Sequence, residues 1–202
     1  MQELQYLEKL AAGWKRLLAY GLVTALLGLG VSLLFPLEYS STMRLLIIQK
    51  QLSTTDPYTA IKAAEGMSTN LSQIMYTTSF YDKVMTAKFN IDQSYFKADE
   101  RKRREQWNKM IATSVTRESG MLVVTVYHKD PEQASQIARA IAFVMTTEGW
   151  QYVGSDLQVK LVDDPLQSRW PTRPNLPGNA ITGFVIGAIL GSVRVLTKKH
   201  QA

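Results

Sequence analysis

The sequence predicts an extracytoplasmic α+β domain, a mixed sheet packed with helices, held between two transmembrane helices. Two uncharged stretches, residues 17–35 and 176–193, lie near opposite ends of the chain. The segment between them alternates patterns typical of strands with patterns typical of helices. Its first predicted strand follows the first stretch directly, and its last predicted strand precedes the second.

The first uncharged stretch has the length of a membrane-spanning helix. About 20 apolar residues, each rising about 1.5 Å, cross the hydrocarbon core of a bilayer. The run is too long for the apolar region of a signal peptide, and residues 36–40 offer no small-x-small cleavage site. We therefore expect an uncleaved helix at residues 17–35. The second helix is expected at residues 178–196, with the charge of Arg194 reaching the membrane interface.

Basic residues flank both apolar stretches and set the expected orientation, because the cytoplasmic flanks of spanning helices collect lysine and arginine. Three precede the first helix and three end or follow the second: Lys9, Lys15, Arg16, Arg194, Lys198 and Lys199. We expect residues 1–16 and 197–202 in the cytoplasm of a bacterium, and residues 36–170 outside its inner (plasma) membrane. Most of the net charge of +6 lies in the tails, so it indicates topology and not nucleic-acid binding.

The first half of the outer domain predicts one strand and three helices. Residues 39–50 form a β-rich run, and helical spacing of apolar residues follows Asp56-Pro57 through about residue 76. A second helix is expected to start at Ser79, with Asp82 as its capping-box partner. Residues 99–111 predict a third helix that is polar on most of its circumference. Its apolar stripe consists of Trp107, Met110 and Ile111.

The second half predicts two paired strands, a helix and a final strand. Residues 121–128 are β-rich, and residues 113–117 are their expected partner across a turn at 118–120. Asp130 is expected to cap a helix that begins with proline, with the Gln133 side chain reaching back to the cap. The buried face of this helix is expected to contain Ala134, Ile137, Ala138, Ile141 and Met145. A strand over 156–163 is expected to end the domain. Its pairing with the first strand would hold together the two segments that connect the domain to the membrane helices.

A proline-rich segment at residues 171–177 joins the domain to the second helix. Pro171, Pro174 and Pro177 recur every three residues. This period favours polyproline II, an extended conformation without internal hydrogen bonds. We expect a stiff stalk.

Three glycines, Gly183, Gly187 and Gly191, recur every four residues in the second apolar stretch. On a helix they share one face, which lets another helix approach closely. Glycine is common in membrane helices, so the spacing also arises by chance. Its place directly after the proline segment favours a packing role.

This order of segments resembles the polysaccharide co-polymerase family, the Wzz-type chain-length determinants of bacterial O-antigen, capsule and exopolysaccharide pathways. The resemblance covers nearly the whole chain. It comprises a membrane helix, a strand, a strand followed by an Asp-Pro-Glu-Gln-Ala helix, another strand, and a proline-rich run into a glycine-spaced helix. The family signature maps here onto Pro171, Pro174, Pro177, Gly183, Gly187 and Gly191.

The resemblance implies a non-catalytic homo-oligomer that regulates the chain length of a surface polysaccharide, such as the O-antigen of lipopolysaccharide. It also implies a polysaccharide polymerase and a lipid-linked glycan as partners. The chain departs from the longer family members, because it has neither their long helical extension nor a fused kinase. It is similar to short transmembrane adaptors that accompany a separate kinase. Two alternatives stay open: an adaptor that activates a cytoplasmic tyrosine kinase, and a small two-helix channel lined by the glycine helix.

Four successive basic residues at 101–104 are a candidate contact for an anionic glycan or for phospholipid headgroups. Successive helical residues turn by about 100°, so the four encircle the helix instead of forming one patch. Arg101 and Arg104 share a face and are the best candidates within the run. The more ordinary interpretation is a solvated helix surface.

We expect no catalytic residue, metal or cofactor. The chain has no cysteine, and His128 is the one histidine outside the tails, expected at a loop edge. Asp163 and Asp164 are expected to end the last strand, where neighbouring side chains point to opposite faces and do not form a carboxylate pair. No GxxxxGK[ST] phosphate-binding motif occurs. The expected tails are too short for a kinase fold.

Overall fold

The computed structural model describes four stretches of the chain: residues 12–49, 57–117, 119–154 and 157–197. The chain divides into two compact units. One contains residues 38–172, and the other combines residues 1–37 with residues 173–202. The predicted turn position 118 and most of both tails lie outside the described residues.

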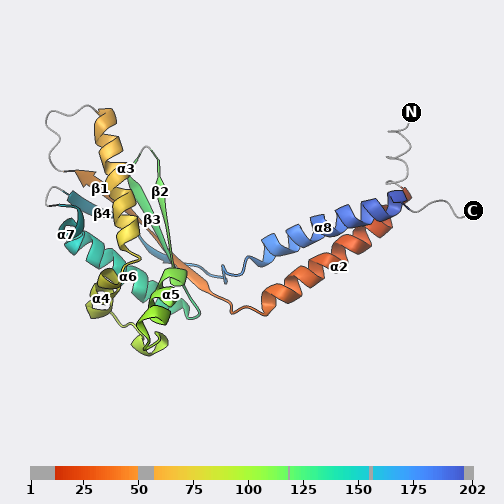
Figure 1. Cartoon of the computed structure of the whole chain (residues 1–202), viewed down its shortest axis with the longest axis horizontal. Helices are drawn as coiled ribbons and strands as arrows, with labels where there is room; N and C mark the ends of the chain where they lie inside the picture. The colour runs from red at the N-terminus through yellow and green to blue at the C-terminus, as the bar shows by residue number, and fades with distance from the viewer. Residues whose placement is uncertain (1–11, 50–56, 118, 155–156, 198–202) are drawn as a thin grey trace, which may run out of the picture. The chain divides into compact units, whose positions relative to one another are not determined.

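The unit of residues 38–172 contains four strands and a set of helices (Figure 1). In chain order they are β1 (Tyr39–Gln49), α3 (Pro57–Ile74), α4 (Thr78–Thr86), the 3₁₀ turn η1 (Gln93–Tyr95), α5 (Glu100–Met110), β2 (Ile111–Thr116), β3 (Met121–His128), α6 (Pro131–Glu148), α7 (Trp150–Val153) and β4 (Leu157–Gln167). The predicted α+β class is confirmed.

The strands form one sheet in the order β2-β3-β1-β4, and every neighbouring pair is antiparallel. The predicted mixed sheet is wrong in this respect. Strands β3 and β4 run in the same direction and are joined through α6, but β1 lies between them, so no parallel pair forms. The predicted pairing of the first and last strands, β1 and β4, is confirmed.

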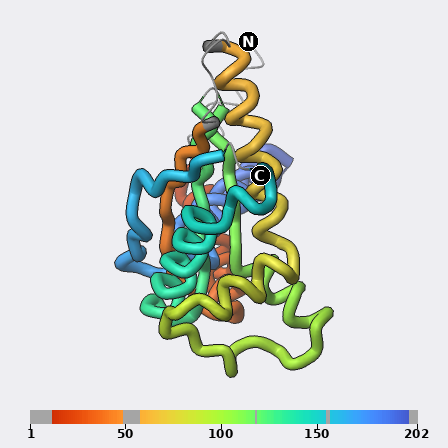
Figure 2. The backbone as a smooth tube through the Cα atoms, turned by 90° about the vertical axis from the view of Figure 1, so that its left-hand side faces the viewer, coloured from red at the N-terminus to blue at the C-terminus, as the bar shows by residue number. Residues whose placement is uncertain are grey.

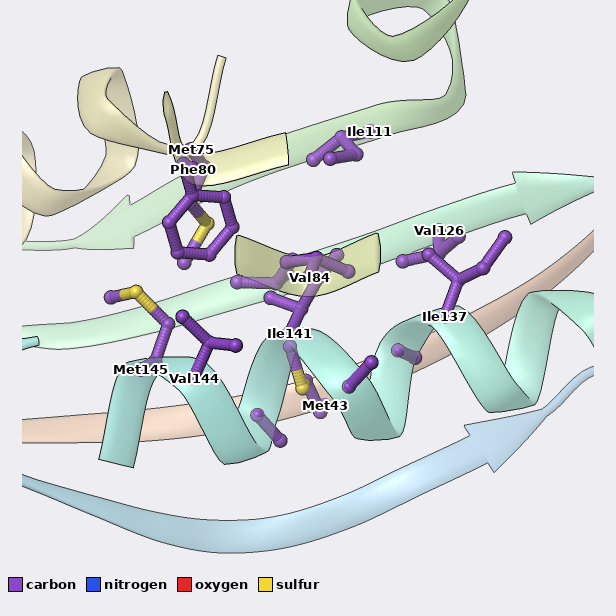
Figure 3. Packing of buried hydrophobic residues seen from close by; sticks show 14 of the residues in the cluster. Met43, Met75, Phe80, Val84, Ile111, Val126, Ile137, Ile141, Val144 and Met145 are labelled. Atoms are coloured by element: carbon purple, nitrogen blue, oxygen red, sulfur yellow. The ribbon is translucent and has the colours of Figure 1, made fainter. Parts of the chain in front are cut away.

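Helices cover one face of the sheet and bury its inward side chains. Along β3, Leu122, Val124 and Val126 are fully buried, whereas the residues between them are half-buried. This alternation is typical of an antiparallel sheet with one covered face. Helix α6 contributes the residues predicted for its buried face, and Figure 3 shows Ile137, Ile141 and Met145 directed at the strands. Figure 2 shows α3 and α6 running alongside the strands that they contact.

Trp107 anchors α5 in the same core, as its place in the apolar stripe predicts. The side chain is 1% exposed, and its indole N–H donates to the backbone oxygen of Met75 at 2.8 Å. The ring of Tyr81 meets it edge to face at 5.1 Å. A buried indole needs such an acceptor, because an unpaired N–H in an apolar core costs about 1–3 kcal/mol.

One predicted helix start is corrected, and one predicted capping contact does not form. Helix α4 is capped by Thr77, whose side chain accepts from the backbone N–H of Phe80, so Ser79 and Asp82 form no capping box. Asp130 caps α6 as expected, accepting from the second and third residues of the helix. Gln133 does not reach back to Asp130. It accepts from Asp92 N–H at 2.8 Å instead, which fastens the loop before η1 to α6.

Strand β4 continues beyond its predicted end at Asp163. It runs through Asp164 and Pro165 to Gln167, and its register with β1 shifts twice on the way. Carboxylates and a proline are tolerated here because β4 is an edge strand, whose outer side needs no ladder partner.

The second unit is a pair of apolar helices, α2 (Trp14–Leu33) and α8 (Leu176–Thr197). By length and composition, both are candidates for crossing a membrane. Helix α2 begins three residues before the predicted span and ends two residues before its predicted end. Helix α8 includes Pro177, which was predicted to lie in the stalk. The Asn175 side chain accepts from Gly178 N–H at 2.9 Å, which fixes this earlier helix start.

Candidate functional site

The glycine face of α8 lies directly against α2 of the same chain. A Cβ atom added at Gly187 would overlap the Thr24 hydroxyl and the backbone of Tyr20. One added at Gly183 would lie 2.7 Å from the backbone oxygen of Thr24, and one at Gly191 would lie 3.2 Å from Tyr20 Cβ. Since backbone cannot yield as a flexible side chain does, glycine is required where α8 crosses Thr24. The glycine face of α8 is therefore covered by α2 within one chain.

Helix α2 supplies its own close contacts, which the sequence analysis missed. A Cβ at Gly21 would lie 2.7 Å from the ring of Phe184, and one at Gly28 would lie 3.1 Å from the backbone oxygen of Asn179. The seven-residue spacing of Gly21 and Gly28 places them on one helix face, and this spacing was the available signal. Both helices therefore contribute small residues to the contact.

Polar side chains link the two helices as well. The Thr24 hydroxyl lies 2.7 Å from the backbone oxygen of Gly183, within donating distance. The Asn179 amide donates to the Ser32 hydroxyl at 2.7 Å. Inside a bilayer an interhelical hydrogen bond of this kind contributes about 0.6 kcal/mol. The glycine contacts and these bonds make α2 and α8 a closed helical hairpin.

The proline-rich segment is divided between the two units. Pro171 and Pro174 lie outside α8, and Pro177 lies in its first turn. The backbone N–H of Thr172 donates to the backbone oxygen of Glu38 at 2.8 Å. Thr172 is therefore hydrogen-bonded to the residue that precedes β1. The stiffness expected of the stalk stays a prediction.

Arg101 and Arg104 do not behave as a pair. Arg104 donates to the Thr78 hydroxyl from Nε at 3.0 Å and from Nη2 at 2.7 Å, and it also pairs with Glu100. These contacts fasten α5 to the start of α4. Arg101 is exposed. The guanidinium of Arg103, between them, lies over the ring of Tyr81, 5.5 Å from its centroid. The side chains of the basic run therefore do not form one patch.

His128 is the last residue of β3, as its predicted position at the end of a strand requires, but its burial was not predicted. It is 5% exposed, and its Nδ1 accepts from the backbone N–H of Asp130 at 2.9 Å. The ring of Tyr95 lies 4.2 Å away, measured between ring centroids. Burial lowers the pKa of His128 and outweighs the nearby carboxylates, which act in the opposite direction. A neutral imidazole at the end of β3 thus positions the α6 cap.

The two adjacent aspartates lie in different surroundings, as the strand alternation predicts. Asp163 pairs with Arg44 of the neighbouring strand at 2.7 Å. Asp164 lines a groove beside Phe143. Among the described residues, no three histidine or carboxylate side chains come together as a metal site.

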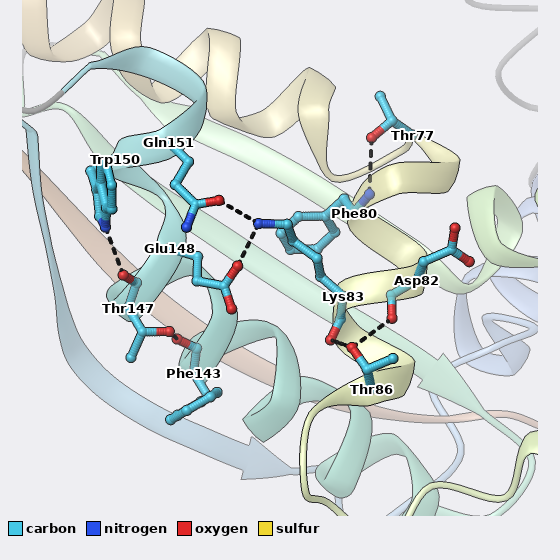
Figure 4. A network of polar contacts seen from close by, with 10 residues as sticks. All are labelled: Thr77, Phe80, Asp82, Lys83, Thr86, Phe143, Thr147, Glu148, Trp150 and Gln151. Atoms are coloured by element: carbon cyan, nitrogen blue, oxygen red, sulfur yellow. Dashed lines mark hydrogen bonds and ion pairs between the residues drawn. The ribbon is translucent and has the colours of Figure 1, made fainter.

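Lys83 is the centre of a polar network that joins α4 to α6 and α7 (Figure 4). Its ammonium contacts the Glu148 carboxylate and donates to Gln151 Oε1 at 2.6 Å. It also lies over the ring of Tyr152, 5.3 Å from the centroid. The hydrogen bond to Glu148 raises the pKa of Lys83, so this lysine stays charged at neutral pH. Its surroundings favour a structural ion pair over a nucleophilic amine.

No family model matches the chain, and no curated protein is significantly similar to it.

Proposed function

We propose that the chain crosses the inner membrane twice and holds its α+β domain outside the cytoplasm. There it acts without catalysis, as a homo-oligomer, to regulate the length of a surface polysaccharide. The observation that carries the proposal is the pairing of β1 with β4. Each of these neighbouring strands is the part of the domain closest in the chain to a candidate membrane helix, so the domain is attached through two adjacent connections.

The surface of the helical hairpin supports its place in a membrane. Leu26 and Leu27 of α2 are 67% and 64% exposed, and Ile189 and Leu190 of α8 are 58% and 56% exposed. Large aliphatic side chains at this exposure would be unfavourable in water, at about 25 cal/mol for each Å² of apolar surface. Lipid removes this cost. The basic residues outside both helices support cytoplasmic tails.

The non-catalytic role is supported by the surroundings of the titratable groups. Lys83 and His128 have shifted pKa values, as catalytic groups often have. Each nevertheless has a structural explanation: Lys83 joins helices, and His128 supports the α6 cap. The polysaccharide assignment itself rests on the order of segments that the chain shares with the Wzz-type family.

The geometry gives little support to a channel lined by the glycine helix. The face that carries Gly183, Gly187 and Gly191 is filled by α2. A water-filled path would have to use another face of α8, where the exposed side chains are aliphatic, such as Ile181 and Val185. Activation of a kinase would depend on residues 197–202, most of which lie outside the described residues.

Deletion of the gene, followed by separation of the surface polysaccharides by size on a gel, tests the proposal. The proposal predicts a changed length distribution that is restored by the wild-type gene on a plasmid. A length distribution that stays the same without the gene would contradict it. A plasmid that lacks the codons for residues 197–202 tests the kinase alternative. That alternative predicts that a partner protein loses its phosphorylation.

A further inference from the structure

Phe143 is an unusual residue on the outward surface of α6. The exposed positions of this helix are otherwise polar: Glu132, Arg139, Thr146 and Thr147. Phe143 is 48% exposed in their midst, and the ring of Phe89 meets it edge to face at 5.9 Å. A surface helix normally turns polar side chains outward. An aromatic residue in the middle of this polar stripe is a candidate contact for another protein surface.

Grooves open on both sides of the two phenylalanines. One, of about 500 Å³, lies between α6 and β4 and is lined by Arg139, Leu161 and Asp164. The other, of about 530 Å³, reaches Lys83 and Glu148. Both are open to solvent instead of enclosed, whereas a small-molecule site usually buries most of its ligand. Open grooves beside a protruding ring fit a protein surface better.

The first groove carries two charges that have no ion-pair partner among the described residues. Arg139 projects from α6, and Asp164 from the edge strand β4. Neither occurs in an ion pair, although Lys83, Arg44 and Arg104 all do. A surface that presents one cation and one anion around an apolar centre is complementary to itself. A two-fold contact is isologous, so it is able to pair the Arg139 of each copy with the partner's Asp164.

Strand addition is disfavoured at this place, although β4 is the open edge of the sheet. Pro165 lacks a backbone N–H, and Asp163 and Asp164 bring charge to the edge. These features protect edge strands against pairing with another strand. The register shifts of β4 also break the regular ladder that a new strand would need. A partner therefore has to bind through side chains on the surface of α6 and β4, and not by adding a strand to the sheet.

We propose that this surface, defined by Phe89, Arg139, Phe143, Leu161 and Asp164, is a contact between two copies of the chain. The Phe143 rings lie near the two-fold axis and fill the partner's groove between α6 and β4. The two Arg139–Asp164 pairs flank them and set the register. This inference rests on the homo-oligomer of the proposed function, because it names a surface through which two copies in one membrane meet.

A charge-reversal series in the full-length protein, in detergent micelles, tests the contact. The oligomeric state is measured by light scattering over a concentration series. Arg139→Asp and Asp164→Arg each place like charges opposite one another, and each should weaken the dimer. The double variant restores opposite charges and should regain most of the wild-type dimer. A wild-type chain that stays monomeric, or a double variant no better than either single one, would overturn the proposal.

Phe143→Glu is the second arm of the experiment. Loss of a central aromatic anchor should weaken the dimer by about tenfold or more. Ile61→Glu is the matched control, because Ile61 is 40% exposed on α3 and lines neither groove. A dimer that resists Phe143→Glu also overturns the contact, whatever the gene deletion shows. Unchanged polysaccharides after gene deletion would instead contradict the proposed function and leave the dimer measurement intact.

Discussion

Thr24 of α2 and Gly187 of α8 are in direct contact, with no room for a side chain on the glycine. A Cβ atom at Gly187 would overlap the Thr24 hydroxyl, which itself lies 2.7 Å from the backbone oxygen of Gly183. One residue therefore both limits the distance between the helices and supplies a hydrogen bond across them. This makes the helical hairpin sensitive to single substitutions.

Substitution Gly187→Leu should separate α2 from α8, because the new side chain meets backbone on α2. We expect a lower melting temperature of the purified chain in detergent, together with a longer distance between spin labels placed on the two helices. Gly30→Leu is the control. An added Cβ at Gly30 meets nothing within 4 Å, so the same change in the other helix should leave both measurements near wild type. Equal effects of the two substitutions would contradict the packing.

Asn179→Ala should remove the hydrogen bond to Ser32 and destabilise the hairpin by about 0.6 kcal/mol. The cost stays small because the Ser32 hydroxyl still donates to the backbone oxygen of Gly28 at 2.8 Å. Ser192→Ala is the comparison, since the Ser192 hydroxyl donates within its own helix, to Ile189. Unfolding in graded denaturing detergent measures the difference between the two variants. No difference between them would show that the interhelical bond contributes nothing.

His128 should make the stability of the α+β domain depend on pH. Burial lowers its folded-state pKa below the unfolded value of about 6.5. The unfolded chain therefore binds the proton more readily. The contribution of the neutral imidazole is fully present above the unfolded pKa, and it is lost as the pH falls from about 6.5 toward the folded pKa.

The variant His128→Asn tests this, because its Oδ1 can replace Nδ1 as acceptor for Asp130 N–H without titrating. The free energy of unfolding, measured from pH 8 to pH 5, should fall less steeply for the variant than for the wild type. Identical slopes would mean that His128 is not held neutral in the folded chain. His200 is the only other histidine and is present in both proteins.

The sequence predicted the elements whose signals are local. Asp130 followed by proline marks the start of α6, and the alternation along residues 121–128 marks β3; both agree with the structure. Strand β4 was predicted too short because two carboxylates and a proline usually end a strand. Their tolerance follows from the edge position of β4, which is a property of the whole sheet and cannot be read from one segment.

The features that were missed depend on contacts between distant segments. Burial of His128 results from the packing of Tyr95, which lies 33 residues earlier in the chain, as the numbering shows. The roles of Gly21 and Gly28 emerge only when α8 is placed against α2. The Gln133 side chain has a local partner available in Asp130. It forms its hydrogen bonds with the backbone of the loop at residues 90–92 instead. Apart from the seven-residue spacing of Gly21 and Gly28, residue patterns within one element contain no information on these choices.

Membrane topology is the central claim, and the absence of cysteine makes it directly measurable. A single cysteine is introduced as Lys102→Cys, at an exposed position on α5, and in a separate variant as Gln201→Cys in the C-terminal tail. Cells with a permeabilised outer envelope and an intact inner membrane are treated with a maleimide that cannot cross membranes. The account predicts that the Lys102→Cys variant is labelled in these cells and that the Gln201→Cys variant is labelled only after lysis. Labelling of the Lys102→Cys variant only after lysis would contradict it.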